Sequence, residues 1–159
     1  MDVASFSEIE QEFSDRVSRI VWCTMTTVDR SDRPRARIIH PIWDGSAGWI
    51  ATGRHSFKEK HLAHSPWVSL SYRDPEHQQI HADCRAEWVD ESSEKERIWK
   101  LYGSTAPPLG YDLHMFWKDG PQDPSYGLLK LTPWRIELSA LGDMMQGKQA
   151  RVWRQEVAG

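Results

Sequence analysis

The links between the strand-like runs of this chain are short, and this limits its fold more than any other feature. Apolar and polar residues alternate with period two along several runs rich in β-branched residues, as expected for half-buried strands. Before Pro66 only one link has a helical pattern, and that helix is too short for a crossover between parallel strands. Antiparallel pairing is therefore expected. The predicted strands cover residues 21–28, 35–43, 48–51, 67–72, 78–89 and 126–138.

About six strands joined by short turns predict a mainly β fold, a barrel or a sandwich, with short flanking helices. A length of 159 residues suits one domain with a sizeable core. We place the strands within residues 20–139 and a C-terminal tail at 140–159, with Trp153 as its only strong anchor. Pro133 lies inside the last predicted strand and cannot donate a ladder hydrogen bond, so an edge, a bulge or a break is expected there.

Two helices are predicted from capping boxes, in which a Ser is followed three residues later by a Glu. Ser5 opens the first helix, residues 5–19, whose apolar residues recur at helical spacing. Ser93 opens the second. Residues 103–125 are rich in proline and glycine and are expected to form a loop with one or two helical turns around residues 112–117.

A third capping box, Ser56 with Glu59, follows the strand that ends near Thr52. The N-terminus of a helix favours an anion, because its backbone N–H groups are free and its dipole is positive there. Lys58 lies in the first turn of this helix, and Arg37 on an earlier strand could reach the same point. These residues predict a phosphate site. A short surface helix with solvated lysines explains this stretch of sequence equally well.

Composition argues against several classes of function. The net charge of −3 has no basic stripe, which argues against nucleic acid, and no apolar run is long enough to span a membrane. We expect a cytoplasmic protein, because the N-terminus lacks a signal pattern and Cys23 and Cys84 suit buried free thiols. His61 and His64 are three apart on one helix, but surface histidines are favoured and no metal site is expected. Nine tryptophans fit a thin core, an interface or a flat aromatic ligand.

Taken together, these elements resemble the pyridoxamine 5′-phosphate oxidase-like FMN-binding split-barrel superfamily, in its small bacterial flavin- or deazaflavin-dependent branch. The resemblance covers residues 21–89, and residues 132–138 resemble the closing strand. The phosphate-binding pattern of the family, Thr-x-x-x-Ser-Arg-Lys-x-x-x-Leu-x-x-x-Pro, is matched here by Thr52, Ser56, Phe57, Lys58, Leu62 and Pro66. Its Arg followed by an apolar strand is matched by Arg37, Ile38 and Ile39.

The resemblance implies a six-stranded Greek-key split barrel that binds FMN across a homodimer interface. Arg37 and Lys58 would neutralise the phosphate, Thr52 and Ser56 would hydrogen-bond it, and the Ile38–Ile39 backbone would contact the ring. Gln79 would correspond to the family's glutamine that reaches the ring edge. The long loop from Pro107 to Pro124 is expected to cover a cofactor site, its own or the neighbouring subunit's.

Departures from the family pattern limit the function that this resemblance implies. Phe57 replaces a phosphate-binding Arg, for which Arg54 could compensate, and Ile42 replaces a Lys near the ring. The C-terminal substrate motif of true pyridoxamine phosphate oxidases is not recognisable in residues 142–159. We therefore expect an FMN-dependent oxidoreductase that acts on a different small organic molecule. The alternatives are a deazaflavin-dependent reductase and a non-catalytic protein that binds flavin or haem.

Overall fold

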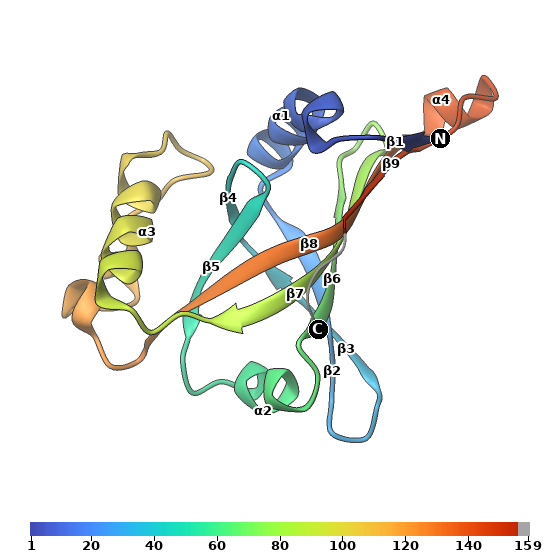
Figure 1. Ribbon diagram of the computed structural model, residues 1–159. Coiled ribbons are helices and arrows are strands. Elements are labelled where there is room, and N and C mark those ends of the chain that lie inside the picture. Colours follow the sequence, from blue (N-terminus) through green and yellow to red (C-terminus); the bar gives the residue numbers. More distant parts are fainter. Residues whose placement is uncertain (156–159) are drawn as a thin grey trace.

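The computed structural model describes residues 1–155, and within this range nine strands form one sheet (Figure 1). All pairings are antiparallel except that of β1 with β9. The strands run in the order β1-β9-β8-β7-β6-β2-β3, with β5 joining β8 and β4 joining β5. Their bounds are β1 (Asp2–Val3), β2 (Cys23–Val28), β3 (Pro34–Ile39), β4 (Ile42–Asp44), β5 (Ala47–Gly53), β6 (Trp67–Arg73), β7 (Gln78–Trp88), β8 (Tyr126–Ala140) and β9 (Arg151–Arg154).

The mainly β prediction is confirmed. The six predicted strands correspond to β2, β3, β5, β6, β7 and β8, and the structure adds the short strands β1, β4 and β9. The predicted second strand, residues 35–43, is interrupted after Ile39, so that its end forms β4. Pro41 lies in this interruption and has no N–H to continue the ladder, which explains the break.

Strand β8 connects the sheet. It pairs with β7 over most of its length, with β5 along residues 126–131 and with β9 along residues 135–138. Pro133 lies between these two partners, and the register of β7 and β8 shifts beside it, between Asp83 and Cys84. An edge, a bulge or a break was expected at this proline, and the structure has a bulge.

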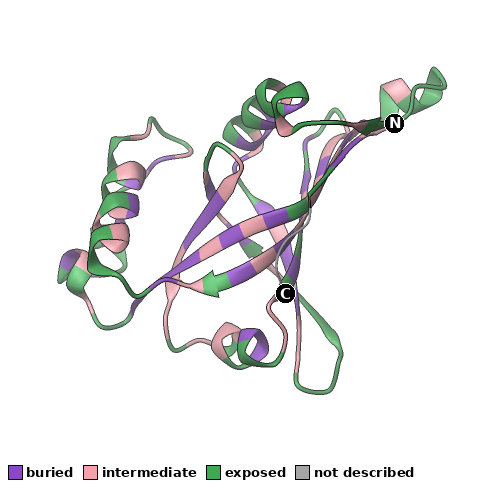
Figure 2. Cartoon of the chain, in the orientation of Figure 1, coloured by how far each residue is buried: buried purple, intermediate pink, exposed green. Residues whose placement is uncertain are grey.

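Alternating strand residues enclose the core (Figure 2). Met25, Leu70 and Ile80 are fully buried there, and Cys23 and Cys84 are buried free thiols, as expected. A second apolar cluster lies under α3 (Ser92–Ser104) and the loop that follows it. The loop contains two 3-10 turns. The first, η2 (Leu113–Met115), lies where a helical turn was predicted, and the second, η3 (Gly120–Gln122), lies beyond that region.

Helices α1 (Glu10–Ile20) and α2 (Phe57–His64) lie at opposite ends of the barrel strands (Figure 1). The predicted helix at 5–19 is divided into a 3-10 turn, η1 (Phe6–Glu8), and α1, and its capping box forms. The other two boxes do not form. Helix α3 begins one residue earlier than predicted, at Ser92, with Glu91 as its N-cap. Ser56 is the N-cap of α2, but its hydroxyl makes no capping hydrogen bond.

The tail is more structured than predicted. It contains α4 (Leu141–Met145) and strand β9, which carries the buried Trp153 between β8 and β1. The sequence did not indicate β1 or β9, because strands of two and four residues are too short to show a period. No helix in residues 1–155 has the length and hydropathy needed to cross a bilayer.

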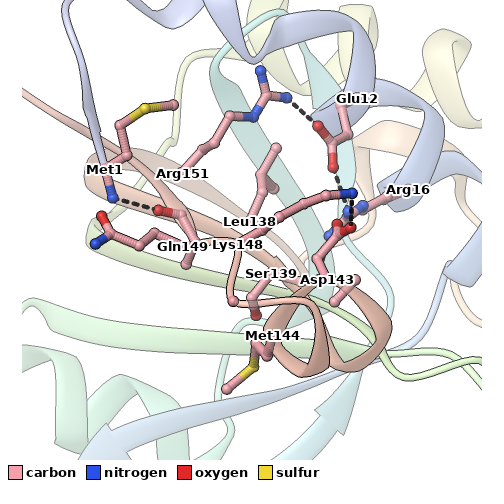
Figure 3. A pocket seen from close by; sticks show the side chains of 13 residues that line it. Met1, Glu12, Arg16, Leu138, Ser139, Asp143, Met144, Lys148, Gln149 and Arg151 are labelled. Carbon is pink, nitrogen blue, oxygen red and sulfur yellow. Dashed lines mark hydrogen bonds and ion pairs between the residues drawn. The ribbon is translucent and has the colours of Figure 1, made fainter.

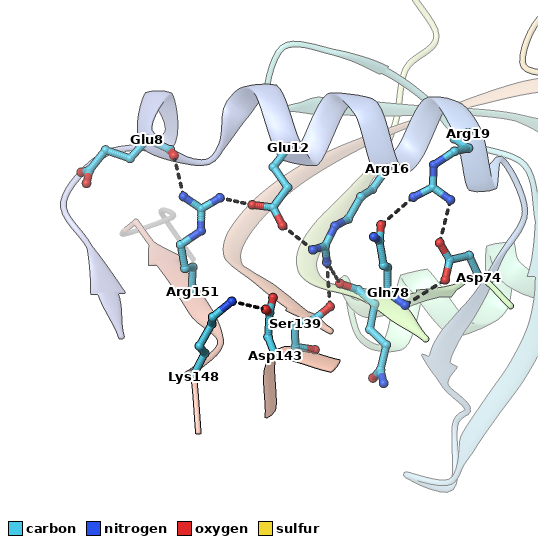
Figure 4. Close-up of polar contacts among 11 residues, drawn as sticks. Glu8, Glu12, Arg16, Arg19, Asp74, Gln78, Ser139, Asp143, Lys148 and Arg151 are labelled. Atoms are coloured by element: carbon cyan, nitrogen blue, oxygen red, sulfur yellow. Dashed lines mark hydrogen bonds and ion pairs between the residues drawn. The ribbon is translucent and has the colours of Figure 1, made fainter. Parts of the chain in front are cut away.

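Arg16 joins α1 to the sheet (Figure 4). Its guanidinium donates to the backbone oxygens of Gln79 at 2.8 Å and Ser139 at 2.7 Å, and it pairs with Glu12. Glu12 also pairs with Arg151 of β9. The Arg16 side chain is only 7% exposed, so its charge is compensated within the protein rather than by solvent.

We expect Arg16→Leu to lower the free energy of unfolding by about 2–4 kcal/mol, because two part-buried carbonyl oxygens lose their donor and Glu12 loses one of its two arginine partners. Arg154→Leu is the matched control, since Arg154 is half-exposed and its partner Asp2 is 77% exposed. Arg154→Leu should lower the free energy of unfolding by no more than about 1 kcal/mol. Urea denaturation of both variants measures this. Equal losses would contradict the anchoring role of Arg16.

Candidate functional site

A groove of about 500 Å³ lies between β3, β5, the start of α2 and the loop after α3. Five of the residues predicted to bind a cofactor line it together, although they come from three separate elements. These five are Arg37, Ile38, Ile39, Thr52 and Lys58. The other residues that line the groove are Trp22, His40, Ala51, Gly53, Pro108, Tyr111, Met115, Phe116 and Trp117.

Arg37 and Lys58 give one end of this groove a positive charge. Both are half-buried, and within residues 1–155 neither forms an ion pair with a carboxylate. Burial, and then the charge of Arg37, lowers the pKa of Lys58. Burial, and then Arg35, lowers the pKa of Arg37. The two cations therefore destabilise one another, and an anion bound between them would relieve this.

Two buried polar atoms beside these cations lack a protein partner. Arg37 Nη1 and Ser56 Oγ are both inaccessible to solvent and make no hydrogen bond within the described chain. An unsatisfied buried donor typically costs about 1–3 kcal/mol, and a hydrogen bond to a ligand would recover this cost. A phosphate offers several acceptor oxygens to donors of this kind. The residues present therefore fit the phosphate of a cofactor.

The sequence did not identify His61 and Thr27 as part of this region. His61 was expected at the surface, but it is only 8% exposed. Its Nδ1 lies 2.9 Å from Thr27 Oγ1 and 3.4 Å from Arg37 Nη2. Helical spacing could have indicated this position, because His61 follows Lys58 by three residues and shares its face. Thr27 could have been found from period two, since it alternates with the buried Cys23 and Met25.

Aromatic residues form the other wall of the groove. The rings of Trp22 and Tyr111 each lie 4.9 Å from the ring of His40. His40 Nε2 is 2.6 Å from the carbonyl oxygen of Leu109 and connects the end of β3 to the loop. Burial lowers the pKa of His40 and raises that of Tyr111, so both are neutral near pH 7. Residues of the long loop thus line the groove of their own chain.

Four residues considered for the site do not line the groove. Ser56 is the N-cap of α2, two residues before Lys58, but it is not part of the lining. Gln79 is on β7, where it pairs with Ser139, and it does not line the groove of its own chain. Phe57 is 80% exposed. Arg54 does not supply a free cation, because it pairs with Glu59 at 2.6 Å and stacks on Trp88. The Arg54 pair also explains why Glu59 does not complete the capping box with Ser56.

A second cavity, of about 520 Å³, lies between α1, α4 and the ends of β8 and β9 (Figure 3). It contains Arg16, Lys148 and Arg151, but each of these cations already has a carboxylate partner, Glu12 or Asp143. The groove at Arg37 differs because its cations have no such partner among residues 1–155. Nor do His, Cys, Asp and Glu side chains gather in threes as a metal site anywhere in this range.

Comparisons with known proteins agree with this fold. A Clostridium acetobutylicum protein related to general stress protein 26 of B. subtilis has a TM-score of 0.73 at 14% identity, over 95% of this chain and 96% of that chain. A pyridoxamine 5′-phosphate oxidase-related, FMN-binding protein from Nostoc punctiforme has a TM-score of 0.66 at 13% identity, over 98% of both chains. An F420 reductase has a TM-score of 0.57 at 15% identity, over 77% of this chain and 94% of that chain.

These identities are low, so the likenesses show the fold alone. No curated protein matches this chain by sequence. A family model does match, however: the model described as pyridoxamine 5′-phosphate oxidase covers residues 9–140, which include every strand from β2 to β8. A match over most of the chain shows its family. This chain belongs to the pyridoxamine 5′-phosphate oxidase family.

Proposed function

We propose that this protein is a cytoplasmic, FMN-dependent oxidoreductase that acts on a small organic molecule. The observation that carries the proposal is the pair Arg37 and Lys58, two half-buried cations without a carboxylate partner among residues 1–155. Arg37, Lys58, Ser56 and Thr52 would hold the phosphate. Bound FMN would supply the hydride-accepting ring, which is the chemistry that the side chains cannot provide.

The protein would bind the flavin ring, orient it and exclude water. Ile38 and Ile39 would lie against the ring from β3, and the aromatic residues of the loop would cover it. His40 and Tyr111 are neutral in this wall, so they add no charge that competes with the cation pair. We assign no catalytic residue.

A deazaflavin coenzyme is the second candidate, because the fold is shared with an F420 reductase as well as with an FMN-binding protein. Phe57 also favours a cofactor other than FMN, since it leaves the site one cation short of the FMN-binding pattern. A protein that binds flavin or haem without turnover is the third. Ile42 motivates it, because this side chain is buried in the second core cluster and offers no polar group to the ring.

Purified protein titrated with FMN should quench flavin fluorescence and show saturable binding, and a deazaflavin coenzyme should bind more weakly. Riboflavin serves as the control, because it has the ring without the phosphate, and it should bind at least about tenfold more weakly than FMN. Turnover with NADH or NADPH and an electron acceptor tests the enzyme proposal. No binding of FMN at millimolar concentration would remove the proposed cofactor.

Lys58→Ala should weaken FMN binding by about tenfold or more, because a charge-assisted hydrogen bond contributes roughly 1.5–3 kcal/mol. Lys60→Ala is the matched control on the same helix. Lys60 is exposed and does not line the groove, so its loss should change the affinity less than about twofold. Fluorescence titration at one ionic strength compares them. Equal effects would place the phosphate elsewhere.

We propose that the protein is a homodimer. Four large apolar side chains at the groove are unusually exposed: Trp22 by 58%, Ile38 by 67%, Met115 by 67% and Phe116 by 64%. Exposed apolar groups that gather in one place are typical of interaction surfaces. A second copy would cover them and close the open side of the groove. Gln79, which lies away from the groove of its own chain, would then be free to serve the partner's site.

Sedimentation equilibrium at micromolar protein should give twice the mass of the 18.5 kDa chain. Met115→Lys should shift the equilibrium toward monomer, because it places a charge in an interface that association would desolvate. Lys118→Met is the control, since it changes charge in the same loop at an exposed residue outside the groove. Monomeric wild-type protein that binds FMN normally would refute the dimer.

A further inference from the structure

Arg37 is oriented by an uncharged side chain rather than by a carboxylate. Its Nη2 lies 3.4 Å from His61 Nδ1. The hydroxyl of Thr27, a fully buried residue of β2, lies 2.9 Å from the same His61 Nδ1 atom. The Arg37 Nη1 atom is also buried and has no partner in the described chain. The guanidinium therefore has one nitrogen in contact with His61 and another that no group within residues 1–155 satisfies.

The chemistry of these groups determines which atoms carry protons. Arginine has only donors, so the Nδ1 atom that faces Arg37 must carry a lone pair. His61 is then the neutral tautomer with its proton on Nε2, and the Thr27 hydroxyl donates to Nδ1 as well. Burial, and then the charge of Arg37, lowers the pKa of His61, which agrees with a neutral ring.

A neutral acceptor has an advantage at an anion site. An Asp or Glu at this place would orient Arg37 more strongly, but its charge would cancel the charge that the ligand needs. His61 orients the guanidinium and leaves its full charge available. Because the guanidinium is planar and rigid, holding Nη2 also fixes the direction of Nη1. A cation oriented in advance loses less conformational freedom when the anion binds.

We infer that His61 is a positioning residue, which holds the Arg37 guanidinium so that its free nitrogen faces a phosphate bound with Lys58 and Ser56. This inference rests on the proposed function for the identity of the phosphate as part of FMN. His61 itself does not line the groove, so it acts through Arg37. Its effect should therefore be confined to ligands that carry the phosphate.

The test compares three substitutions. His61→Leu removes the acceptor, and His61→Met removes it with a more adaptable side chain in case the leucine variant does not fold. His61→Asn retains an acceptor near the Nδ1 position without a titratable ring. His64→Leu is the control on the same helix, because within residues 1–155 the His64 ring has one polar contact, at 2.8 Å with the exposed Asp32. FMN, riboflavin and inorganic phosphate are titrated into each protein.

His61→Leu and His61→Met should weaken FMN binding by roughly tenfold and leave riboflavin binding unchanged, because only the phosphate contacts Arg37. His61→Asn should recover most of the affinity, and His64→Leu should bind as wild type. Equal losses for FMN and riboflavin would indicate a merely structural role and overturn the inference. Failure of His61→Asn to bind better than His61→Leu would also overturn it.

Inorganic phosphate separates this inference from the proposed function. If the wild-type protein binds phosphate but not FMN, the proposed cofactor is wrong, and the same variants still test His61 through phosphate-dependent thermal protection. Protection that is lost in His61→Leu and His61→Met and restored in His61→Asn would support the positioning role. Protection that is unchanged in all of them would contradict it.

Discussion

Strand β8 pairs with three other strands, β5, β7 and β9, and these pairings hold both the core and the groove together. The first half of β8 pairs with β5, which carries Thr52 and leads into α2, while its second half pairs with β9. Both halves pair with β7 on the other side, and the bulge at Pro133 occurs where one partner gives way to the next. A strand cannot have two partners along one edge at the same residue, so this change of partner opens the sheet between β5 and β9.

Cations near α1 have protein partners that neutralise them, whereas Arg37 and Lys58 near α2 do not within the described chain. At α1, every cation of the Arg16 network has a carboxylate or a carbonyl partner, which suits a structural anchor. At α2, Arg37 and Lys58 approach each other without an acid among residues 1–155. Such an arrangement lowers the stability of the folded protein. It is typical of a binding site, where a ligand provides the missing charge.

Local patterns predicted the long strands and the start of α2, because period two and the N-cap serine reflect interactions between near neighbours in the chain. Local patterns gave wrong predictions where a residue distant in the sequence formed the contact instead. Glu59 was expected to cap α2, but Arg54 binds it. His61 was expected in solvent, but Thr27 and Arg37 approach it from β2 and β3. Strand β9 forms by pairing with β8, and β1 forms because the start of the chain meets β9.

The sequence by itself determined the mainly β class. It also predicted an anion site at Arg37, Thr52, Ser56 and Lys58, because a helix start with a lysine and a strand arginine are local signals for an anion. Only the tertiary structure decided that Arg37 and Lys58 lack carboxylate partners, that Ser56 Oγ is left free and that His61 holds Arg37. These are properties of atoms brought together from β2, β3 and α2, and contacts between elements distant in sequence leave no periodic signal along the chain.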